Sequence, residues 1–220
     1  MPAARAGRAA APPMKLFLAS YRLGGAGTGL ARLVPAPRRA TVVANAADAW
    51  PAAAREWAVR SEIDMLADIG ITARELDLRE HRGDPDGVRE ILARSDLVWL
   101  RGGNTFVLRS RLAQSGADGI ITDLVREGSL VYGGYSAGAA IAAPSLDGLE
   151  WCDDPAESLQ ECGIPAAWSG LGLVPFRIVP HYRSPGHEHP ERIDGLVQQY
   201  SRAGTSFRAL TDSDVIIIDD

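Results

Sequence analysis

Residues 134–138 read Gly-Tyr-Ser-Ala-Gly, which is the G-x-S-x-G spacing of a turn that presents a serine nucleophile. The apolar run Leu130–Tyr132 before it predicts a strand, and the small residues 139–143 after it are compatible with a helix. Flanking glycines let the backbone bend tightly enough to expose the serine oxygen. The N–H groups that open the helix then face a reacting carbonyl group. The pattern predicts nucleophilic catalysis by Ser136, against the alternative of a tight turn with an incidental serine.

A second glycine motif, Arg-Gly-Gly-Asn-Thr at residues 101–105, follows the apolar run Leu97–Leu100 and opens a predicted helix. Ligands of parallel sheets gather at the carboxyl ends of the strands, where this loop and the serine turn both belong. Two glycines allow a backbone N–H to approach a ligand closely. Gly103 is therefore a candidate donor to a developing oxyanion. Taken alone, the motif reads as an ordinary glycine turn before a capped helix.

His181 follows the short apolar run 178–180, at the end of another predicted strand. A general base must lie within hydrogen-bond distance of the serine, and a strand-end histidine on the same edge of the sheet meets that requirement. We therefore predict His181 as the base. His187 and His189 lie close together in a proline-rich loop without an obvious third ligand, so we expect no metal site. His81 belongs to a charged segment and reads as part of a solvated loop.

A carboxylate should hold the imidazole of such a base in the correct tautomer. Three candidates, Glu150, Asp153 and Asp154, lie between the serine and the histidine in the irregular stretch Pro144–Trp168. Clusters of charge in such loops are often only solvated. The residue pattern alone leaves all three candidates open.

These motifs need strands and helices to position them. Short apolar runs predict strands at 16–19, 41–44, 74–78, 97–100, 130–132, 178–179 and 215–218. Helical spacing and capping residues predict helices at 52–69, 86–93, from Asn104 to Gly116, around 120–125 and around 193–200. Alternating strands and helices imply an α/β fold, a mostly parallel sheet with helices on both faces.

The bulk composition fits one globular domain. The chain has 220 residues, of which 46% are hydrophobic and 23% charged, and such a length can bury a large core without disulfides. A net charge of −5 argues against a nucleic-acid partner, and no apolar run is long enough for a membrane span. Cys152 and Cys162 form no paired metal-binding pattern, which favours a reduced, cytoplasmic protein.

The N-terminal stretch 1–13 is rich in Ala, Arg and Pro and lacks the apolar centre of a signal peptide. We interpret it as a disordered tail, or as a segment upstream of a start at Met14. A single domain is predicted for residues 14–220.

Taken together, these motifs resemble the peptidase E family of aspartyl dipeptidases. The resemblance is carried by Gly-Gly-Asn-Thr-Phe at 102–106, Gly-Tyr-Ser-Ala-Gly-Ala at 134–139, Pro-Ser at 144–145 and Pro-His at 180–181, in the family's order. This family is related to cyanophycinase and shares the fold of class I glutamine amidotransferases, a three-layer α/β sandwich.

The resemblance implies a role for each matching residue. It makes Ser136 the nucleophile, His181 the base, and the backbone N–H groups of Gly103 and Ala137 the oxyanion donors. The family's aspartate falls a short way past the Pro-Ser pair, which selects Asp153 once a small insertion is allowed, with Asp154 and Glu150 as alternatives. No cofactor is implied. The expected partner is a small peptide, and a homodimer is one assembly that the sequence leaves open.

One departure concerns specificity. In the family an arginine in the loop after the histidine is credited with holding the substrate's aspartate side chain. The loop 183–192 is shorter here, and no arginine aligns without a gap. Arg183 and Arg192 are the candidates to replace it, and Arg183 could instead bind a terminal carboxylate. Strict selection for N-terminal aspartate is therefore not expected.

Two other functions fit parts of the pattern. An esterase of the α/β-hydrolase type shares the serine turn, but its histidine usually lies near the C-terminus and a His-Gly-Gly-Gly loop is absent here. A non-catalytic ligand-binding member of the same fold would not need both Ser136 and His181. We therefore favour the peptidase.

Overall fold

The computed structural model describes residues 13–219, so the predicted N-terminal tail lies outside the described residues except for Pro13. Six strands form the main sheet, in the order β3-β2-β4-β5-β1-β8. Strands β1 to β5 run parallel to their neighbours, and β8 pairs antiparallel with β1 at one edge. The strands are β1 (Lys15–Ala19), β2 (Arg39–Val43), β3 (Thr72–Glu75), β4 (Leu97–Leu100), β5 (Val131–Tyr135) and β8 (Val215–Asp219).

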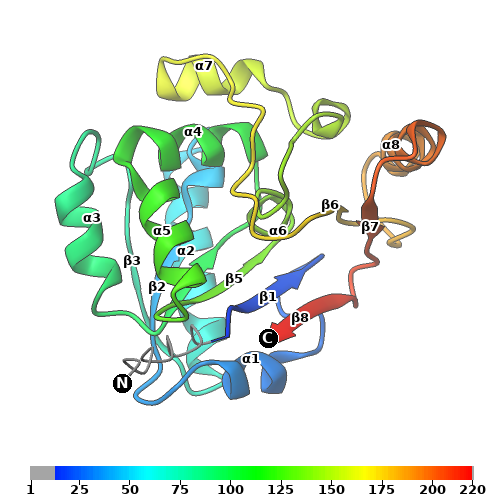
Figure 1. Cartoon of the computed structure of the whole chain (residues 1–220). Helices are drawn as coiled ribbons and strands as arrows, with labels where there is room; N and C mark the ends of the chain where they lie inside the picture. The colour runs from blue at the N-terminus through cyan, green and yellow to red at the C-terminus, as the bar shows by residue number, and fades with distance from the viewer. Residues whose placement is uncertain (1–12, 220) are drawn as a thin grey trace, which may run out of the picture.

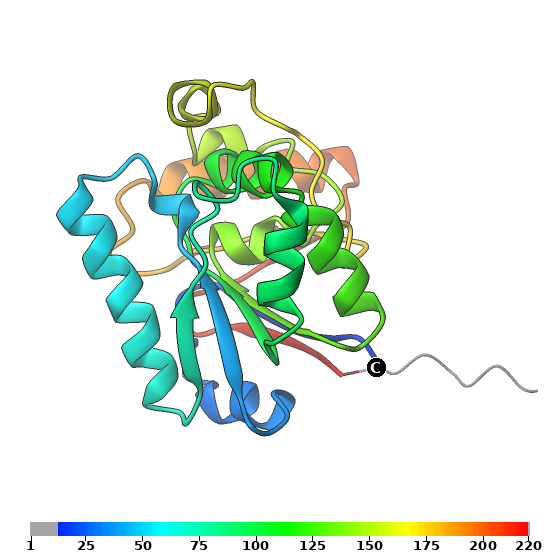
Figure 2. The same cartoon turned by 90° about the vertical axis from the view of Figure 1, so that its left-hand side faces the viewer.

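Helices cover both faces of this sheet (Figure 1). One face carries α1 (Gly27–Leu33) and α2 (Ala52–Ala67), and the other carries α3 (Pro85–Leu92), α4 (Thr105–Ser115) and α5 (Ala117–Arg126). In the turned view the cyan α2 and the green α4 and α5 lie on opposite sides of the strands (Figure 2). The predicted mostly parallel α/β sandwich is confirmed.

Side-chain alternation explains why the sheet needs two helical layers. In β1, Leu16 and Leu18 belong to the core under α3, α4 and α5, while Phe17 and Ala19 belong to the core under α1 and α2. All four residues of β4 are buried, as its uninterrupted apolar run predicts. A strand with apolar residues on both faces cannot leave either face in water without losing hydrophobic stabilisation.

The remaining elements lie at the carboxyl end of the sheet. The short helix α6 (Ala137–Ala140) follows β5, and a second, two-stranded parallel sheet joins β6 (Arg177–Val179) to β7 (Phe207–Ala209). Between these strands runs α8 (Pro190–Ala203), which packs Ile193, Leu196 and Tyr200 into the core. The helix α7 (Ala156–Cys162) lies against α4 at the top of the molecule (Figure 1).

Most predicted elements are present with small shifts at their ends. Asn104 caps α4 as predicted, since its side-chain oxygen accepts from the N–H groups of Phe106 and Val107. Gly116 ends that helix in the left-handed conformation, at φ 73°. Besides two short 3₁₀ turns, three elements were not predicted: α1 in the glycine-rich stretch after β1, α7 in the stretch 144–168, and the three-residue strand β7.

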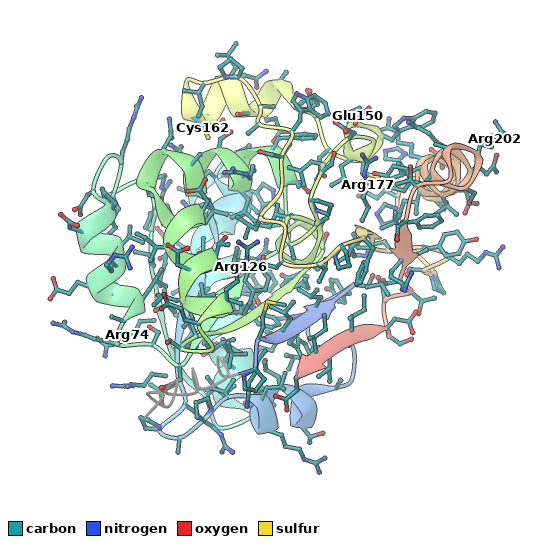
Figure 3. All side chains as sticks on the ribbon, in the orientation of Figure 1. Arg74, Arg126, Glu150, Cys162, Arg177 and Arg202 are labelled. Carbon is teal, nitrogen blue, oxygen red and sulfur yellow. The ribbon has the colours of Figure 1, made fainter. Side chains whose placement is uncertain are left out.

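The helices between residues 13 and 219 are all too short or too polar to cross a bilayer. Of the two free cysteines, Cys152 is exposed and Cys162, at the end of α7, is buried (Figure 3).

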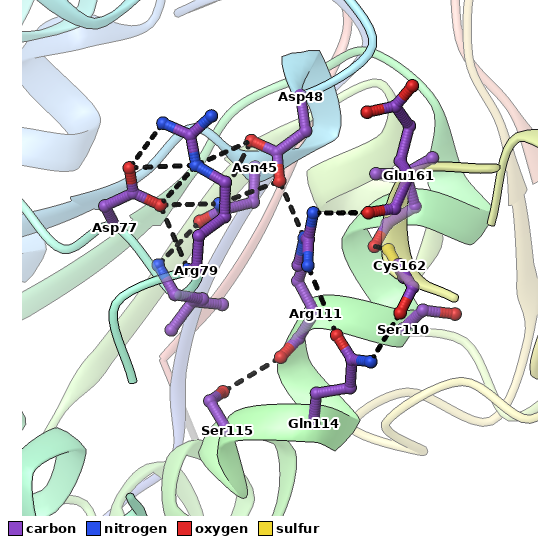
Figure 4. Close-up of polar contacts among 12 residues, drawn as sticks. Asn45, Asp48, Asp77, Arg79, Ser110, Arg111, Gln114, Ser115, Glu161 and Cys162 are labelled. Atoms are coloured by element: carbon purple, nitrogen blue, oxygen red, sulfur yellow. Dashed lines mark hydrogen bonds and ion pairs between the residues drawn. The ribbon is translucent and has the colours of Figure 1, made fainter. Parts of the chain in front are cut away.

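A buried polar cluster around Asp48 fixes the 3₁₀ turn η1 (Asn45–Ala47) after β2 (Figure 4). The Asp48 carboxylate accepts from Asn45 Nδ2 at 3.1 Å, from Arg55 Nε at 3.1 Å and from Arg111 Nε at 2.8 Å. Arg111 also donates to the Glu161 carbonyl at 2.8 Å, which ties α4 to α7. The cluster therefore joins β2, α2, α4 and α7 through one carboxylate.

We expect Asp48→Ala to lower the free energy of unfolding by about 3–5 kcal/mol, because Arg111 loses its ion-pair partner among the described residues, while Arg55 keeps only Glu75 and Asp77. Urea unfolding followed by circular dichroism measures the change. Asp123→Ala, at an exposed position of α5, is the matched control and should shift the free energy by less than about 0.5 kcal/mol. Equal effects of the two substitutions would contradict the cluster's proposed contribution.

Candidate active site

Ser136 lies on a strained turn between β5 and α6. Its backbone has φ 51° and ψ −117°, a region that non-glycine residues rarely occupy. The Ser136 N–H donates to the carbonyls of Ala19 at 3.2 Å and Ser20 at 3.1 Å, which anchors the turn to the end of β1. A Cβ atom on Gly138 would overlap the Leu100 carbonyl, and one on Gly134 would come within 2.8 Å of the Gly138 carbonyl. The two flanking glycines are therefore required by close backbone packing.

The loop after β4 brings Gly103 beside this turn. Gly103 has φ 146°, and a Cβ atom there would overlap the Ala46 carbonyl of η1. The next residue, Asn104, donates its N–H to the same carbonyl at 2.8 Å. Within the described chain the N–H groups of Gly103 and Ala137 have no hydrogen-bond partner. Both predicted donors are thus available to a ligand next to Ser136.

The His181 side chain links Ser136 to a carboxylate that the sequence analysis did not select. Its Nε2 lies 3.0 Å from Ser136 Oγ, and its Nδ1 lies 2.7 Å from Asp212 Oδ1. These contacts form one chain of hydrogen bonds, serine to imidazole to carboxylate. The structure therefore brings Ser136 and His181 together as expected and adds Asp212 as the third side chain.

Ser20, at the carboxyl end of β1, joins the parts of this chain. Its buried hydroxyl accepts from the His181 N–H at 2.7 Å and lies 3.2 Å from Asp212 Oδ1. His181 has φ 60°, so the hydrogen bond to Ser20 helps to hold an unfavourable backbone conformation. The Ser20 hydroxyl therefore connects both His181 and Asp212 to the main sheet.

Asp153, the acid selected from the sequence, lies elsewhere in the site. Its Oδ2 accepts from the Thr105 N–H at 2.9 Å and from Thr105 Oγ1 at 2.5 Å. Burial raises the pKa of this carboxyl above its ordinary value, although the two bonds from Thr105 oppose the shift. Asp153 therefore holds the start of α4, whereas the imidazole of His181 bonds Asp212.

The two alternative acids also bond backbone groups instead of the imidazole. Asp154 accepts from the Ala156 N–H at 2.8 Å, and Glu150 accepts from the Gly148 N–H at 2.6 Å on the 3₁₀ turn η2 (Leu149–Trp151; Figure 3). Asp212 lies after the histidine, in the turn before β8, whereas all three predicted acids lie before the histidine. A carboxylate shortly before the last strand was the available signal.

Two cavities open on either side of Ser136. The first, of about 190 Å³, borders Ser136, His181 and Gly103 and continues to two arginines. The second, of about 560 Å³, borders the same three residues and continues past Asp153 to the loop of His187. Because both cavities reach Ser136, a ligand at this serine can extend in two directions.

Comparisons with known proteins show the family of the chain. The family model described as Peptidase family S51 matches residues 44–220. The chain belongs to this family. Peptidase E of Streptomyces coelicolor is 40% identical over 141 residues, which cover 61% of this chain and 52% of that protein. The uncharacterized peptidase Lin0382 of Listeria innocua is 34% identical over 119 residues, 54% of each chain.

The match to the curated relatives is partial in length, since the aligned segments span about half of each relative. A solved structure from Listeria monocytogenes EGD-e, named "Putative Peptidase E Protein", superimposes with a TM-score of 0.74 at 21% identity. That superposition covers 93% of this chain and 98% of the other, and it shows a shared fold.

In this S51 chain Arg183 does not line either cavity beside Ser136. Its side chain is exposed, and its guanidinium stacks on the Tyr182 ring at 5.0 Å. Arg192 is exposed at the start of α8. The expected substrate contact of Arg183 is thus not supported by its position, because the residue lines neither cavity.

The two histidines of the same loop, His187 and His189, have different neighbours. His187 stacks on His181 with ring centroids 5.2 Å apart, and burial together with that neighbour lowers the pKa of His187. His189 Nδ1 lies 3.3 Å from Glu191 Oε1. Between residues 13 and 219 no group of three or more His, Cys, Asp or Glu side chains is arranged to hold a metal ion.

We expect Gly103→Ala to destabilise the protein by about 2–4 kcal/mol, because the added methyl group overlaps the Ala46 carbonyl and the required φ is unfavourable. Labelling of Ser136 by a fluorophosphonate should also slow, since the loop must move. Gly119→Ala, in α5 with open space around the position, is the control and should be neutral or stabilise by up to about 1 kcal/mol. Similar unfolding curves for both variants would contradict the crowding at Gly103.

Proposed function

We propose that this chain is a serine peptidase that hydrolyses small peptides through an acyl-enzyme on Ser136. The observation that carries the proposal is the continuous hydrogen-bond chain from Ser136 through His181 to Asp212, on a strained turn. Membership of Peptidase family S51 supports the same reaction class. An esterase would use the same groups, and the substrate comparison below separates the two.

The first half of the reaction follows from the contacts of His181. As Ser136 Oγ attacks the peptide carbonyl, Nε2 of His181 takes the hydroxyl proton across the 3.0 Å contact. The Asp212 carboxylate stabilises the imidazolium and keeps Nδ1 as the protonated nitrogen in the resting state. The C–N bond then breaks as Nε2 returns the proton to the leaving amine. Water repeats the sequence to release the acyl group as a carboxylic acid.

The oxyanion of each tetrahedral intermediate needs donors that are already in place. The N–H groups of Gly103 and Ala137 are the candidates, because both flank Ser136 and neither has a partner in the described residues. Loss of one such donor costs about 10²–10³ in kcat in a well-studied serine protease. Asp153 serves this arrangement indirectly in our proposal, since it holds Thr105 directly after the Gly103 loop.

We expect Ser136→Ala to abolish fluorophosphonate labelling and to reduce peptide turnover by several orders of magnitude while leaving the fold intact. Intact mass measures the labelling, and circular dichroism measures the fold. Ser201→Ala, at an exposed position of α8, is the matched control and should behave like the parent. Near-parent turnover by Ser136→Ala would rule out this mechanism. Hydrolysis of acyl esters without any of matched peptides would favour the esterase.

The acid is tested by comparing Asp212→Asn with Asp153→Asn. Asp212→Asn should lower kcat by about 10²–10⁴, because the amide no longer selects the reactive tautomer of His181. Asp153→Asn should retain most of kcat, since its bonds are to Thr105. Steady-state kinetics and thermal unfolding of both variants give the readout. A crippled Asp153→Asn beside a nearly normal Asp212→Asn would reverse the assignment.

A further inference from the structure

The smaller cavity beside Ser136 has a composition unlike the rest of the surface. Its rim carries Tyr21, Trp50 and Trp57, three of the seven large apolar side chains that are exposed among residues 13–219. Its wall carries two arginines, Arg22 and Arg101. Exposed aromatic groups gathered at one opening mark a ligand surface, and arginine beside them indicates an anionic group on that ligand.

Arg101 has the features of a binding group. The residue is only 7% exposed, and its guanidinium lies over the Trp50 ring at 4.6 Å. Its Nη1 donates to the Gly102 carbonyl at 2.7 Å, whereas its buried Nε makes no hydrogen bond with any described residue. No partner for Nη2 is present in the described part of the chain. A desolvated guanidinium with unused donors is costly unless a ligand completes its bonds.

Glu62 forms an ion pair with Arg101 and brings one negative charge to the wall of this cavity. Its Oε1 lies 3.3 Å from Arg101 Nε but already accepts from the Tyr135 hydroxyl at 2.8 Å, and its Oε2 accepts from Trp99 Nε1 at 2.9 Å. Glu62 is fully buried and fixes Arg101 at the wall of the cavity.

Arg22 adds a second cation on the same wall. Its Nη2 donates to the backbone carbonyl and the hydroxyl of Ser61, at 3.2 Å and 2.9 Å. No carboxylate among the described residues lies within ion-pair distance of it. Two guanidinium groups and one carboxylate line this cavity, which leaves one positive charge in excess there.

The cavity on the other side of Ser136 has the opposite character. It is lined by four carboxylates, those of Asp153, Asp154, Glu157 and Glu188. The two cavities meet at Ser136 and His181, so the nucleophile lies on the boundary between a positive and a negative surface. A peptide with an ammonium group at one end and a carboxylate further along matches this polarity in one direction only.

We infer that the Arg101–Arg22 cavity binds a carboxylate of the substrate and so directs short peptides across Ser136 with their N-terminus toward the acidic cavity. The inference rests on the proposed peptidase function. The bound carboxylate is either the C-terminal group of a di- or tripeptide or an acidic side chain. Both would fit between the guanidinium groups, because the planar fork of arginine matches carboxylate oxygens.

The first experiment compares matched peptides. Ala-Ala and Ala-Ala-Ala are compared with their C-terminal amides, which lack the terminal carboxylate. These amides are then compared with Ala-Glu-NH₂ and Asp-Ala-NH₂, which carry a side-chain carboxylate. We expect kcat/KM to be about 10- to 100-fold higher for substrates that carry a carboxylate, which corresponds to hydrogen bonds with a charged partner. A preference for the free acid identifies the C-terminal group, and a preference within the amide series identifies a side chain. Equal rates throughout would overturn the inference.

Substitutions locate the preference. Arg101→Gln and Arg22→Gln should each reduce the ratio of carboxylate to amide substrate, mainly through KM, and Arg101→Lys should restore it only in part because an ammonium group lacks the fork. Arg94→Gln, at a position far from the site with a 73% exposed side chain, is the control and should keep the parent ratio. A ratio that survives in both cavity variants would overturn the inference.

The inference can fail separately from the proposed function. Fluorophosphonate labelling of the parent reports on Ser136 alone, so labelling without carboxylate preference rejects only the cavity's role. Binding of Ala-Ala and its amide to Ser136→Ala, measured by calorimetry, tests the cavity without turnover. Tighter binding of the free acid than of the amide supports the role of the cavity, provided that this difference disappears in the double variant Ser136→Ala/Arg101→Gln. Equal binding, or no binding of either peptide, contradicts it.

Discussion

Close backbone contact at the carboxyl ends of β4 and β5 is the constraint on which the site depends. Gly138 packs on the Leu100 carbonyl and Gly103 on the Ala46 carbonyl, at separations that leave no space for a side chain. Because the backbones touch, the turn at Ser136 and the loop at Gly103 have one arrangement relative to each other. The N–H groups of Ala137 and Gly103 have no partner among the described residues. In the proposed mechanism they are in place before a substrate arrives, and fixed dipoles lose little energy to reorganisation during a reaction.

The second, two-stranded sheet supplies the other half of the site. Pairing of β6 with β7 aligns Val179 with Ala209, and the ladder continues as Tyr182 N–H donates to the Leu210 carbonyl at 2.9 Å. His181 and Asp212 follow these strands directly, so parallel pairing brings them side by side. Ser20 then connects both to β1 of the main sheet. The register of two three-residue strands thus decides which carboxylate meets the imidazole.

The net charge of this protein does not reveal how its charged groups are distributed locally. The chain carries a net charge of −5, yet the cavity beside Ser136 presents two arginines. Buried carboxylates organise the cations: Asp48 holds Arg55 and Arg111 beneath the Gly103 loop, and Glu62 holds Arg101 at the cavity wall. Each carboxylate has several donors, as a buried charge requires.

The sequence by itself determined the parts of this protein that depend on local chemistry. Apolar runs and capping residues predict the main sheet and most of its helices, and Gly-x-Ser-x-Gly predicts the turn at Ser136 because only glycine tolerates such crowding. The sequence also predicts His181 at the end of a strand, but the reason given for its meeting Ser136 was wrong: β6 pairs with β7 in a second sheet and does not share the edge of the main sheet. The tertiary structure decided the rest. β7 is too short to give a periodic signal, so the sequence does not predict the pairing that brings Asp212 to His181. The sequence also does not predict that Arg101 and Arg22 share a cavity, because contacts between the end of β1, α2 and the loop after β4 form that cavity.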